Sequence, residues 1–491
     1  MKRRFHHYID GKSHRPINGQ WIDSINPATG KVWAQIARGN ELDVDIAVKA
    51  AYRASQEPAW RSDPSYRSRV LDTVASRLDE SYEELVGVEV DDNGKRAVEV
   101  TAQMSALGGW YRHFAKLTET AQFQALKTDM KGVSVARDLI PFGVVGAITA
   151  WNSPLMIAAW KIAPALAAGN AVIIKPSELA SCSTVVFAEL VGDLFPSGIL
   201  NVITGLGFEA GASLVQHKGV RKITFTGSEL GGARVAATAA EQVKPTTLEL
   251  GGKSPQIVFE DADIEHTLNG IMSGIFLSNG QSCVAGSRLI IHHSIHDLFV
   301  GKLQNRLAHL KMGNPFDSEV HIGPIANKAQ LDKIVEMVNQ AKADGAKVAA
   351  GGARAKVEGF EGGYFYPPTI LVDVDLDAQI WREEVFGPVL CVTKFDQVEE
   401  AVILANDTEY GLAAGIWTRN QALAKSVSEQ IDAGTVYINH YRSVSAYVPV
   451  GGIKKSGYGR ELGPNAIEAF MQERAVWTGE IQMADPFPVS K

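Results

Sequence analysis

The sequence predicts an α/β protein built around parallel β-sheets, and three observations lead to this fold class. From residue 144 onward, short apolar segments alternate with helical segments, which is typical of parallel strands joined by crossover helices. Gly169-Asn170 follows one of the helical segments and is a good helix C-cap. The chain has 491 residues, of which 45% are hydrophobic, and this length calls for two or three domains. We therefore expect a doubly wound sheet that binds its ligand at the carboxyl ends of its strands.

The first 120 residues predict an extended segment followed by helices. Asn40 is the expected N-cap of a helix over residues 41–56, and Asp63-Pro64 opens a second, amphipathic helix. The apolar positions at helical spacing are Leu42, Ile46 and Ala50 in the first helix, and Val70, Val74, Leu78 and Leu85 in the second.

The alternating region predicts two α/β units that meet near Gly252. In the first we expect strands over residues 144–149, 171–174, 199–203, 221–225 and 247–250, with helices over 156–168, 181–194, 209–216 and 231–242. In the second we expect helices over 263–278, 295–310 and 328–344, and strands over 347–350, 389–395, 415–418 and 435–438. A hairpin over 130–138 and a strand near 475–481 belong to neither unit.

Composition excludes several function classes. The net charge of −7 gives no electrostatic reason to expect nucleic acid as a partner. No apolar run approaches the length of a membrane span, and the basic start of the chain is not followed by the apolar segment of a secretory signal. Three scattered cysteines predict neither a disulfide framework nor a zinc site, and no other metal is expected. A reducing, cytoplasmic compartment fits this composition.

Two short segments could supply a base and a nucleophile. Glu249 stands in Leu248-Glu249-Leu250-Gly251-Gly252-Lys253, and Cys283 stands in Gly280-Gln281-Ser282-Cys283. Attack of a thiolate on a carbonyl, followed by base-assisted hydrolysis, needs both groups. Taken alone, each has a plain alternative, because a lone cysteine is more often a small buried hydrophobe and a strand-end glutamate is usually solvated.

Three other strand ends carry polar residues. Asn152 follows the strand over 144–149 and could stabilise an oxyanion, or could hold the turn before Pro154. Lys175 and Glu178 could grip the two hydroxyls of a ribose, or form an ordinary helix entrance. Gly227-Ser228 opens a helix whose N-terminus suits a pyrophosphate, although it lacks the G-x-G-x-x-G pattern.

Together these segments resemble the NAD(P)-dependent aldehyde dehydrogenase superfamily, in its hydrolytic, non-acylating branch. The resemblance covers essentially the whole chain and rests on six segments in order: Trp151-Asn152-x-Pro154, Lys175-Pro176-Ser177-Glu178, Phe225-Thr226-Gly227-Ser228, Glu249-Leu250-Gly251-Gly252-Lys253, Gly280-Gln281-x-Cys283 and Glu384-x-Phe386-Gly387-Pro388. It implies a Rossmann-type cofactor domain over residues 1–120 and 141–252 and an α/β catalytic domain over 253–450. It also implies a small β oligomerisation arm over 121–140 and 470–491, which builds a homodimer or homotetramer.

The resemblance also implies roles for individual residues. Cys283 is the nucleophile, Glu249 the base that activates water, and Asn152, with the Cys283 backbone N–H, the oxyanion hole. Lys161 and Glu461 match residues proposed to carry the proton away. The cofactor contacts are Ile148, Trp151, Lys175, Glu178, Gly227, Ser228, Glu384 and Phe386.

The implied reaction is oxidation of an aldehyde to the carboxylic acid with reduction of NAD(P)+, through a thiohemiacetal and a thioester on Cys283. NAD is the expected cofactor because the Glu178 carboxylate repels a 2′-phosphate, while Lys175 leaves room for NADP. The positions that match the substrate tunnel are Ser153, Met156, Ile157, Trp160, Leu277, Ser282, Val284, Arg442, Val444 and Val450. Many relatives have Phe where this chain has Ser153 and Val450, so a wider, less aromatic tunnel is expected.

Arg442 could pair with a substrate carboxylate, or could be a solvated or internally paired loop arginine. For the chain as a whole, the alternatives are a CoA-acylating aldehyde dehydrogenase and a catalytically silent binding protein on the same fold. A CoA-acylating enzyme would share the fold and the nucleophile, but members of that branch typically lack the base at the position of Glu249. A binding protein that had lost the chemistry would not be expected to keep Cys283, Glu249 and Asn152. Ester hydrolysis by the same sulfur is a possible side activity.

Overall fold

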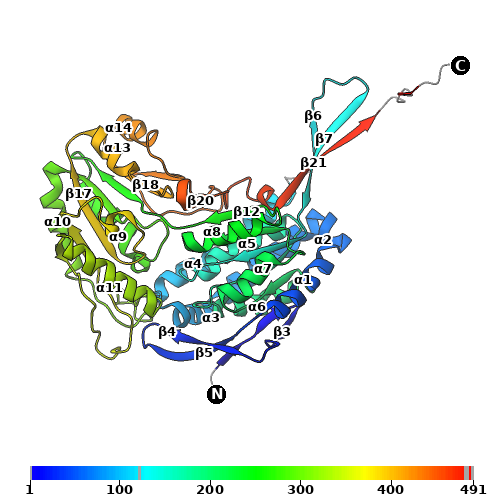
Figure 1. Ribbon diagram of the computed structural model, residues 1–491, viewed down its shortest axis with the longest axis horizontal. Helices are drawn as coiled ribbons and strands as arrows, with labels where there is room; N and C mark the ends of the chain where they lie inside the picture. Colours follow the sequence, from blue (N-terminus) through cyan, green and yellow to red (C-terminus); the bar gives the residue numbers. More distant parts are fainter. Residues whose placement is uncertain (1–2, 120–122, 480–485, 488–491) are drawn as a thin grey trace.

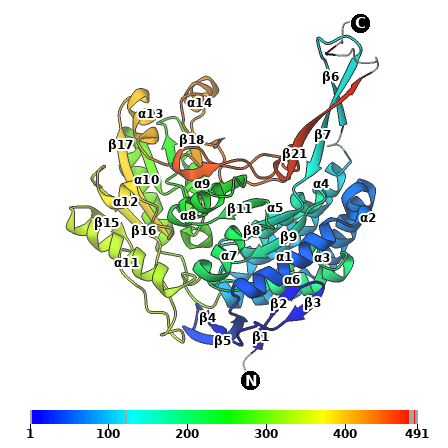
Figure 2. The same cartoon turned by 45° about the vertical axis from the view of Figure 1, so that its right-hand side comes forward.

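Two α/β units and a projecting β arm make up the molecule in this computed structural model (Figures 1 and 2). The structure describes residues 3–119, 123–479 and 486–487. Parts of the predicted arm segments 121–140 and 470–491, and the end of the strand expected near 475–481, lie outside these residues. No helix within the described ranges is long and apolar enough to span a membrane.

The N-terminal region consists of short strands followed by four helices. Asn40 caps α1 through a full capping box with Asp43, which confirms the predicted helix start. The apolar face was predicted correctly only in part, because Ala50 is buried but Leu42 is 52% exposed. Val44 and Val48, which were not predicted, are buried. The elements here are β1 (Arg3–Phe5), β2 (His7–Ile9), β3 (Lys12–His14), β4 (Trp21–Asn26), β5 (Lys31–Ala37), α1 (Glu41–Ser55), α2 (Pro58–Ser62), α3 (Pro64–Asn93) and α4 (Ala97–Leu117).

The first unit is an eight-stranded sheet in the order β20-β12-β11-β8-β9-β10-β2-β3. The pairs from β12 to β10 are all parallel, as expected, and the order reverses direction between β8 and β11. The elements are β8 (Val144–Ile148), α5 (Pro154–Ala167), β9 (Ala171–Lys175), α6 (Cys182–Val191), β10 (Leu200–Val202), α7 (Ala212–Gln216), β11 (Lys222–Thr226), α8 (Glu229–Ala240), β12 (Thr246–Glu249) and β20 (Gly457–Tyr458). The five predicted strands of this unit are confirmed to within one or two residues.

The second unit is a seven-stranded sheet in the order β15-β16-β17-β14-β13-β18-β19, parallel except for the pair β15–β16. Its strands are β13 (Pro255–Val258), β14 (Arg288–His292), β15 (Lys347–Ala350), β16 (Thr369–Val372), β17 (Val389–Phe395), β18 (Ala413–Trp417) and β19 (Thr435–Ile438). Its helices are α9 (Ile264–Phe276), α10 (His293–Leu307), α11 (Lys328–Ala343), α12 (Gln379–Arg382), α13 (Val398–Asn406) and α14 (Gln421–Ser428).

The arm is a three-stranded antiparallel sheet that projects from the body, as both views show (Figures 1 and 2). Its strands are β6 (Phe123–Leu126), β7 (Val133–Pro141) and β21 (Met471–Gly479), and β21 pairs with β7 along its whole length. Exposed apolar side chains on it include Leu126, Val476 and Trp477.

Candidate active site

The polar residues predicted at the strand ends lie along one edge of the first sheet. Ile148 pairs with Lys175 between β8 and β9, Phe225 with Ile148 between β11 and β8, and Thr226 with Glu249 between β11 and β12. Because parallel strands all end at the same edge, this register places the segments after Ile148, Lys175, Thr226 and Glu249 side by side. The reversal of strand order between β8 and β11 is the usual position of a ligand crevice.

Residues 277–284, the cysteine segment, carry Cys283 and follow α9. The segment begins with a turn of unusual backbone conformation. Ser278, Asn279 and Gly280 have φ values of 53°, 54° and 68°. A left-handed residue other than glycine costs roughly 1–2 kcal/mol, so the first two must be held by their surroundings. Asn279 is held by its side chain, which donates to the Pro324 carbonyl at 2.7 Å and accepts from Gly323 N at 3.2 Å.

Cys283 lies directly against the loop that follows Glu249. A Cβ added to Gly252 would stand 2.5 Å from the carbonyl oxygen of Cys283, so only glycine fits at this approach. Burial raises the pKa of Cys283 to about 12, and the charges of Glu384 and Glu249 act in the same direction. The cysteine is unpaired and half-buried, so its sulfur is a neutral thiol that needs a proton acceptor in order to react.

Asn152 is bonded to the same segment. Its Nδ2 donates to the carbonyl of Gln281 at 3.0 Å, which fixes the side-chain amide two residues before Cys283. An amide nitrogen carries two hydrogens, and only one of them is used in this bond. The second is available to an oxygen bound near Cys283.

Glu249 is buried beside a second carboxylate and a lysine. Burial and the charge of Glu461 raise the pKa of Glu249, while Lys161 and Arg460 oppose that rise. Lys161 Nζ donates to Glu461 Oε1 and, at 3.1 Å, to Thr224 Oγ1. Glu249 Oε1 and Glu461 Oε2 have no hydrogen-bond partner among the described residues, so each can still accept a proton or a water hydrogen. The predicted base and the two predicted relay residues therefore form one buried cluster.

The predicted cofactor residues line the adjoining strand ends. Lys175 Nζ donates to Glu178 Oε2 at 3.0 Å. Burial acts to raise the pKa of Glu178, but the charge of Lys175 and several hydrogen bonds give a net lowering, so this carboxylate is ionised. Ser228 caps α8 by accepting from Gly231 N at 3.2 Å. The donor and acceptor pair at 175 and 178 suits the two hydroxyls of a ribose, and the start of α8 suits a pyrophosphate.

Two further predicted cofactor residues, Glu384 and Phe386, lie in the segment before β17. The rings of Trp151 and Phe386 meet edge to face at 5.1 Å. Glu384 Oε1 accepts from Gly252 N at 2.9 Å, and burial raises the pKa of Glu384 to about 7. The loop at 251–252 thus lies between Glu384 and Cys283.

The predicted tunnel residues come from three segments. Ser153, Met156, Ile157 and Trp160 lie at α5, Leu277, Ser282 and Val284 belong to the cysteine segment, and Arg442, Val444 and Val450 follow β19. Trp160 packs on Trp110, with ring centroids 5.8 Å apart. Val450 is paired with Glu461 through two backbone hydrogen bonds of 2.7 and 2.8 Å, which ties this predicted tunnel residue to the buried cluster.

Arg442 is paired internally, which was the second of the two interpretations of this residue. Its guanidinium donates to the carbonyls of Leu277 and Ser273 at 2.8 and 3.2 Å, and to Ser278 Oγ at 3.0 Å. Arg442 therefore stabilises the cysteine segment. Its guanidinium is already bonded to protein oxygens, whereas the hypothesis of a carboxylate-binding arginine assumed a guanidinium that faces the substrate.

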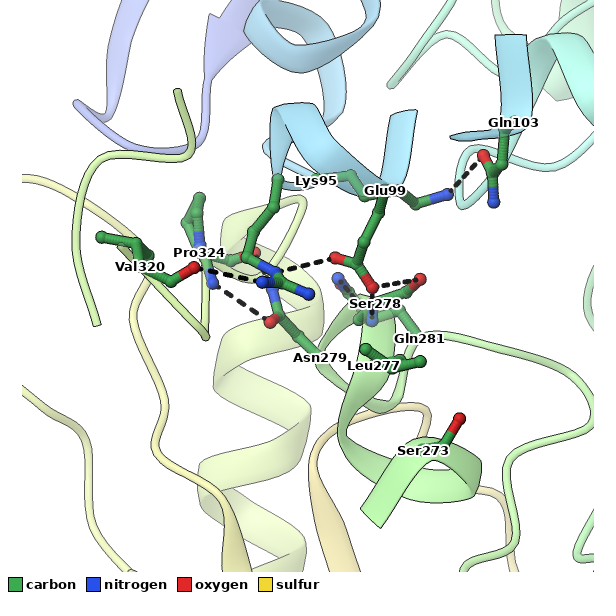
Figure 3. Close-up of polar contacts among 12 residues, drawn as sticks. Lys95, Glu99, Gln103, Ser273, Leu277, Ser278, Asn279, Gln281, Val320 and Pro324 are labelled. Carbon is green, nitrogen blue, oxygen red and sulfur yellow. Dashed lines mark hydrogen bonds and ion pairs between the residues drawn. The ribbon is translucent and has the colours of Figure 1, made fainter. Parts of the chain in front are cut away.

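Several residues that contribute to this site were not predicted. Lys95 is buried and donates to Ser153 Oγ at 2.7 Å. It also donates to Gln103 Oε1 at 3.1 Å (Figure 3), and burial lowers the pKa of Lys95 to about 8. Tyr441 donates to the carbonyl of Val284 at 2.9 Å. Gln281 was noted only as part of a motif. No local pattern marks these residues, because each acts on a segment far away in the sequence.

Comparisons with known proteins agree with the fold. The model of the aldehyde dehydrogenase family matches residues 15–476. The chain is 41% identical to a chloroplastic betaine aldehyde dehydrogenase of Beta vulgaris, over 96% of this chain and 95% of that protein. It is 42% identical to peroxisomal aminoaldehyde dehydrogenase 1 of Pisum sativum, over 96% and 94%. A crystal structure of betaine aldehyde dehydrogenase from Staphylococcus aureus in complex with NAD+ superposes with a TM-score of 0.96, at 35% identity, over 99% of this chain and 96% of that one.

Proposed function

Because the chain belongs to the aldehyde dehydrogenase family, we propose that Cys283, Glu249 and Asn152 perform its NAD-dependent oxidation of an aldehyde to the carboxylic acid. The observation that supports this most strongly is the contact of the Gly252 loop with Cys283, together with the bond from Asn152 to Gln281. These contacts support a site in which a base, a sulfur and an amide donor act on the same substrate.

The first half of the reaction uses Cys283 and Asn152. The sulfur adds to the aldehyde carbon, and its proton passes to a neighbouring base, since a thiol with a pKa of about 12 is not ionised at neutral pH. The carbonyl oxygen becomes an oxyanion, which accepts hydrogen bonds from Asn152 Nδ2 and the Cys283 backbone N–H. NAD, when bound, supplies the hydride acceptor. Oxidation leaves the acyl group as a thioester on Cys283.

The second half uses Glu249. Burial raises the pKa of Glu249, so its carboxylate is a stronger base toward water than an ordinary glutamate. The resulting hydroxide adds to the thioester carbon, the C–S bond breaks, and the departing thiolate takes the acid proton of the product, which leaves as the carboxylate. Lys161 and Glu461, which are hydrogen-bonded to each other, then carry the proton away from Glu249.

NAD is held in this proposal by Lys175 and Glu178 at the adenosine ribose and by Gly227 and Ser228 at the pyrophosphate. Trp151, Ile148, Phe386 and Glu384 complete the contacts on the nicotinamide side. The ionised Glu178 favours a free 2′-hydroxyl over a 2′-phosphate.

The substrate class is proposed from the tunnel. Relatives are named for betaine aldehyde and aminoaldehydes, which are aldehydes with an ammonium or amine group. A quaternary ammonium is best held by aromatic faces, but Trp160 is the one aromatic residue among the ten tunnel positions. The guanidinium of Arg442 is bonded to Ser273, Leu277 and Ser278, but its positive charge still acts near Cys283. We therefore propose that neutral or carboxylated aldehydes are preferred over cationic ones.

A panel of aldehydes matched in length tests this preference. We expect a lower kcat/KM for the trimethylammonium aldehyde than for its neutral and carboxylated counterparts, and a smaller difference in Arg442→Ala. If the cationic aldehyde has the highest kcat/KM, the substrate proposal fails while the reaction type stands.

Assembly and location are proposed with the same reasoning. We propose that β6, β7 and β21, with the exposed Leu126, Val476 and Trp477, join copies of the chain into a homo-oligomer. The proposal includes the domain ranges implied by the resemblance: the cofactor domain over 1–120 and 141–252, the catalytic domain over 253–450, and the arm over 121–140 and 470–491. A cytoplasmic location is proposed from the three free cysteines, whereas the plant relatives are named as chloroplastic or peroxisomal.

Two variants test the proposed chemistry. Cys283→Ala should abolish aldehyde-dependent reduction of NAD, because no other group can form the thioester. Glu249→Gln should release one equivalent of NADH in a burst and then stop, because the thioester is no longer hydrolysed. Activity of Cys283→Ala above background would show that another group is the nucleophile.

A further inference from the structure

Glu99 joins helix α4 of the first unit to the cysteine segment of the second. Figure 3 shows its carboxylate directed at Ser278. Glu99 Oε1 accepts from the backbone N–H of Ser278 at 2.7 Å and from its hydroxyl at 3.4 Å, and Oε2 accepts from Arg96 Nε at 3.1 Å. The side chains of Glu99 and Arg96 are each 13% exposed, so solvent weakens this contact less than it would weaken a surface ion pair.

Ser278 is the residue in the turn that most needs such support. It has φ 53° and ψ 29°, a conformation that a serine rarely adopts, and it begins the run of three left-handed residues. Gly280 takes this conformation without strain, and Asn279 is held through Pro324 and Gly323. Ser278 is held by Glu99 from one side and by Arg442 from the other.

A continuous chain of hydrogen bonds runs from this turn to the reacting groups. The carbonyl of Ser278 accepts from Gln281 N at 3.0 Å. The carbonyl of Gln281 accepts from Asn152 Nδ2 at 3.0 Å, and Cys283 follows two residues later. A rotation of the backbone at Ser278 would therefore move both the amide of Asn152 and the sulfur of Cys283.

We propose that Glu99 is a positioning residue for the reaction, which holds Ser278 in its left-handed conformation so that Asn152 and the Cys283 backbone N–H point at one oxyanion. Glu99 touches neither substrate nor cofactor in this proposal and acts through Ser278. The proposal rests on the roles given above to Cys283 and Asn152.

A mutant cycle between Glu99 and Ser278 tests it. Glu99→Ala removes the carboxylate, and the backbone at Ser278 relaxes toward the ordinary right-handed or extended regions. Misplacement of reacting groups by about 1 Å costs about 10²-fold in rate. We therefore expect kcat to fall 10- to 100-fold, with NAD affinity within twofold of wild type. Ser278→Gly adopts the left-handed conformation without support, so it should return kcat of the double variant to within threefold of Ser278→Gly alone. Glu99→Gln keeps an acceptor for Ser278 N–H and should retain most of kcat.

Controls separate positioning from general stability. Asp193→Ala removes an exposed ion pair with Arg77 of 2.6 Å on the first unit and should leave kcat unchanged at a similar melting temperature. If Glu99→Ala does not fold, Glu99→Asp, which keeps the charge but shortens the reach, takes its place in the cycle. The proposal is overturned if Glu99→Ala, or Glu99→Asp in its place, keeps kcat within threefold of wild type. It is also overturned if Ser278→Gly does not restore the kcat that this variant has lost. Cys283→Ala tests the nucleophile separately, since all Glu99 variants keep the thiol.

Discussion

Replacing Gly252 by alanine tests whether the Glu249 loop and Cys283 meet as the structure shows. The added Cβ would lie 2.5 Å from the Cys283 carbonyl oxygen, and Leu412 Cβ would stand 3.2 Å from it on another side. Ordinary van der Waals contact begins at 3.4 Å, so the loop and the cysteine must separate by about 0.9 Å. A displacement of about 1 Å at reacting groups costs about 10²-fold in rate, and we expect kcat of Gly252→Ala to fall by about that factor.

The assay follows NADH absorbance in single-turnover and steady-state experiments, with NAD affinity measured in parallel. Gly301→Ala is the matched control: it adds the same methyl group inside α10, where a Cβ would meet nothing within 4 Å. The control should keep full kcat and gain about 0.5–1 kcal/mol in free energy of unfolding. A folded Gly252→Ala protein that binds NAD and keeps kcat within threefold of wild type would refute the contact between the two segments.

Further predictions concern pH dependence and cofactor choice. The base must be deprotonated to act, so hydrolysis falls as pH drops through the raised pKa of Glu249. Glu461→Gln removes a charge that raises this pKa, and the acid limb of the kcat–pH profile should move to lower pH. Arg460→Gln removes a charge that lowers the pKa of Glu249, so the acid limb of its kcat–pH profile should move to higher pH. If the acid limbs of both variants moved in the same direction, the electrostatic explanation of this pKa would be contradicted. Glu178→Gln removes the carboxylate that repels a 2′-phosphate and should raise the NADP to NAD ratio of kcat/KM about tenfold or more; an unchanged ratio would count against the role of Glu178.

Elements with strong local signals were predicted correctly. The start of α1 follows from Asn40, which satisfies the free N–H groups of the first turn whatever else the chain does. The buried strands β8 and β9 follow from short apolar runs between turn residues. Each of these signals is contained within a few neighbouring residues.

Other elements were missed because distant contacts stabilise them. The strand β14 begins with Arg288, a residue that argues against a buried strand, yet its guanidinium is fully buried and donates to the carbonyls of Lys253, Leu404 and Ala405 at 2.7–2.9 Å. Leu42 was wrongly assigned to the buried face of α1 because Leu42 and Val44 are both apolar, and only the packing of the sheet selects one of them.

For the site, residue types and spacing left plain alternatives for Cys283, Glu249 and Asn152. Their roles as nucleophile, base and oxyanion donor were predicted from the six ordered segments that resemble the aldehyde dehydrogenase superfamily. The geometry that joins them could not be obtained in this way, because the Glu99–Ser278 and Asn152–Gln281 bonds connect residues 179 and 129 positions apart. No periodicity and no local composition in the sequence marks such pairs, and the bonds form only once the two units have packed together.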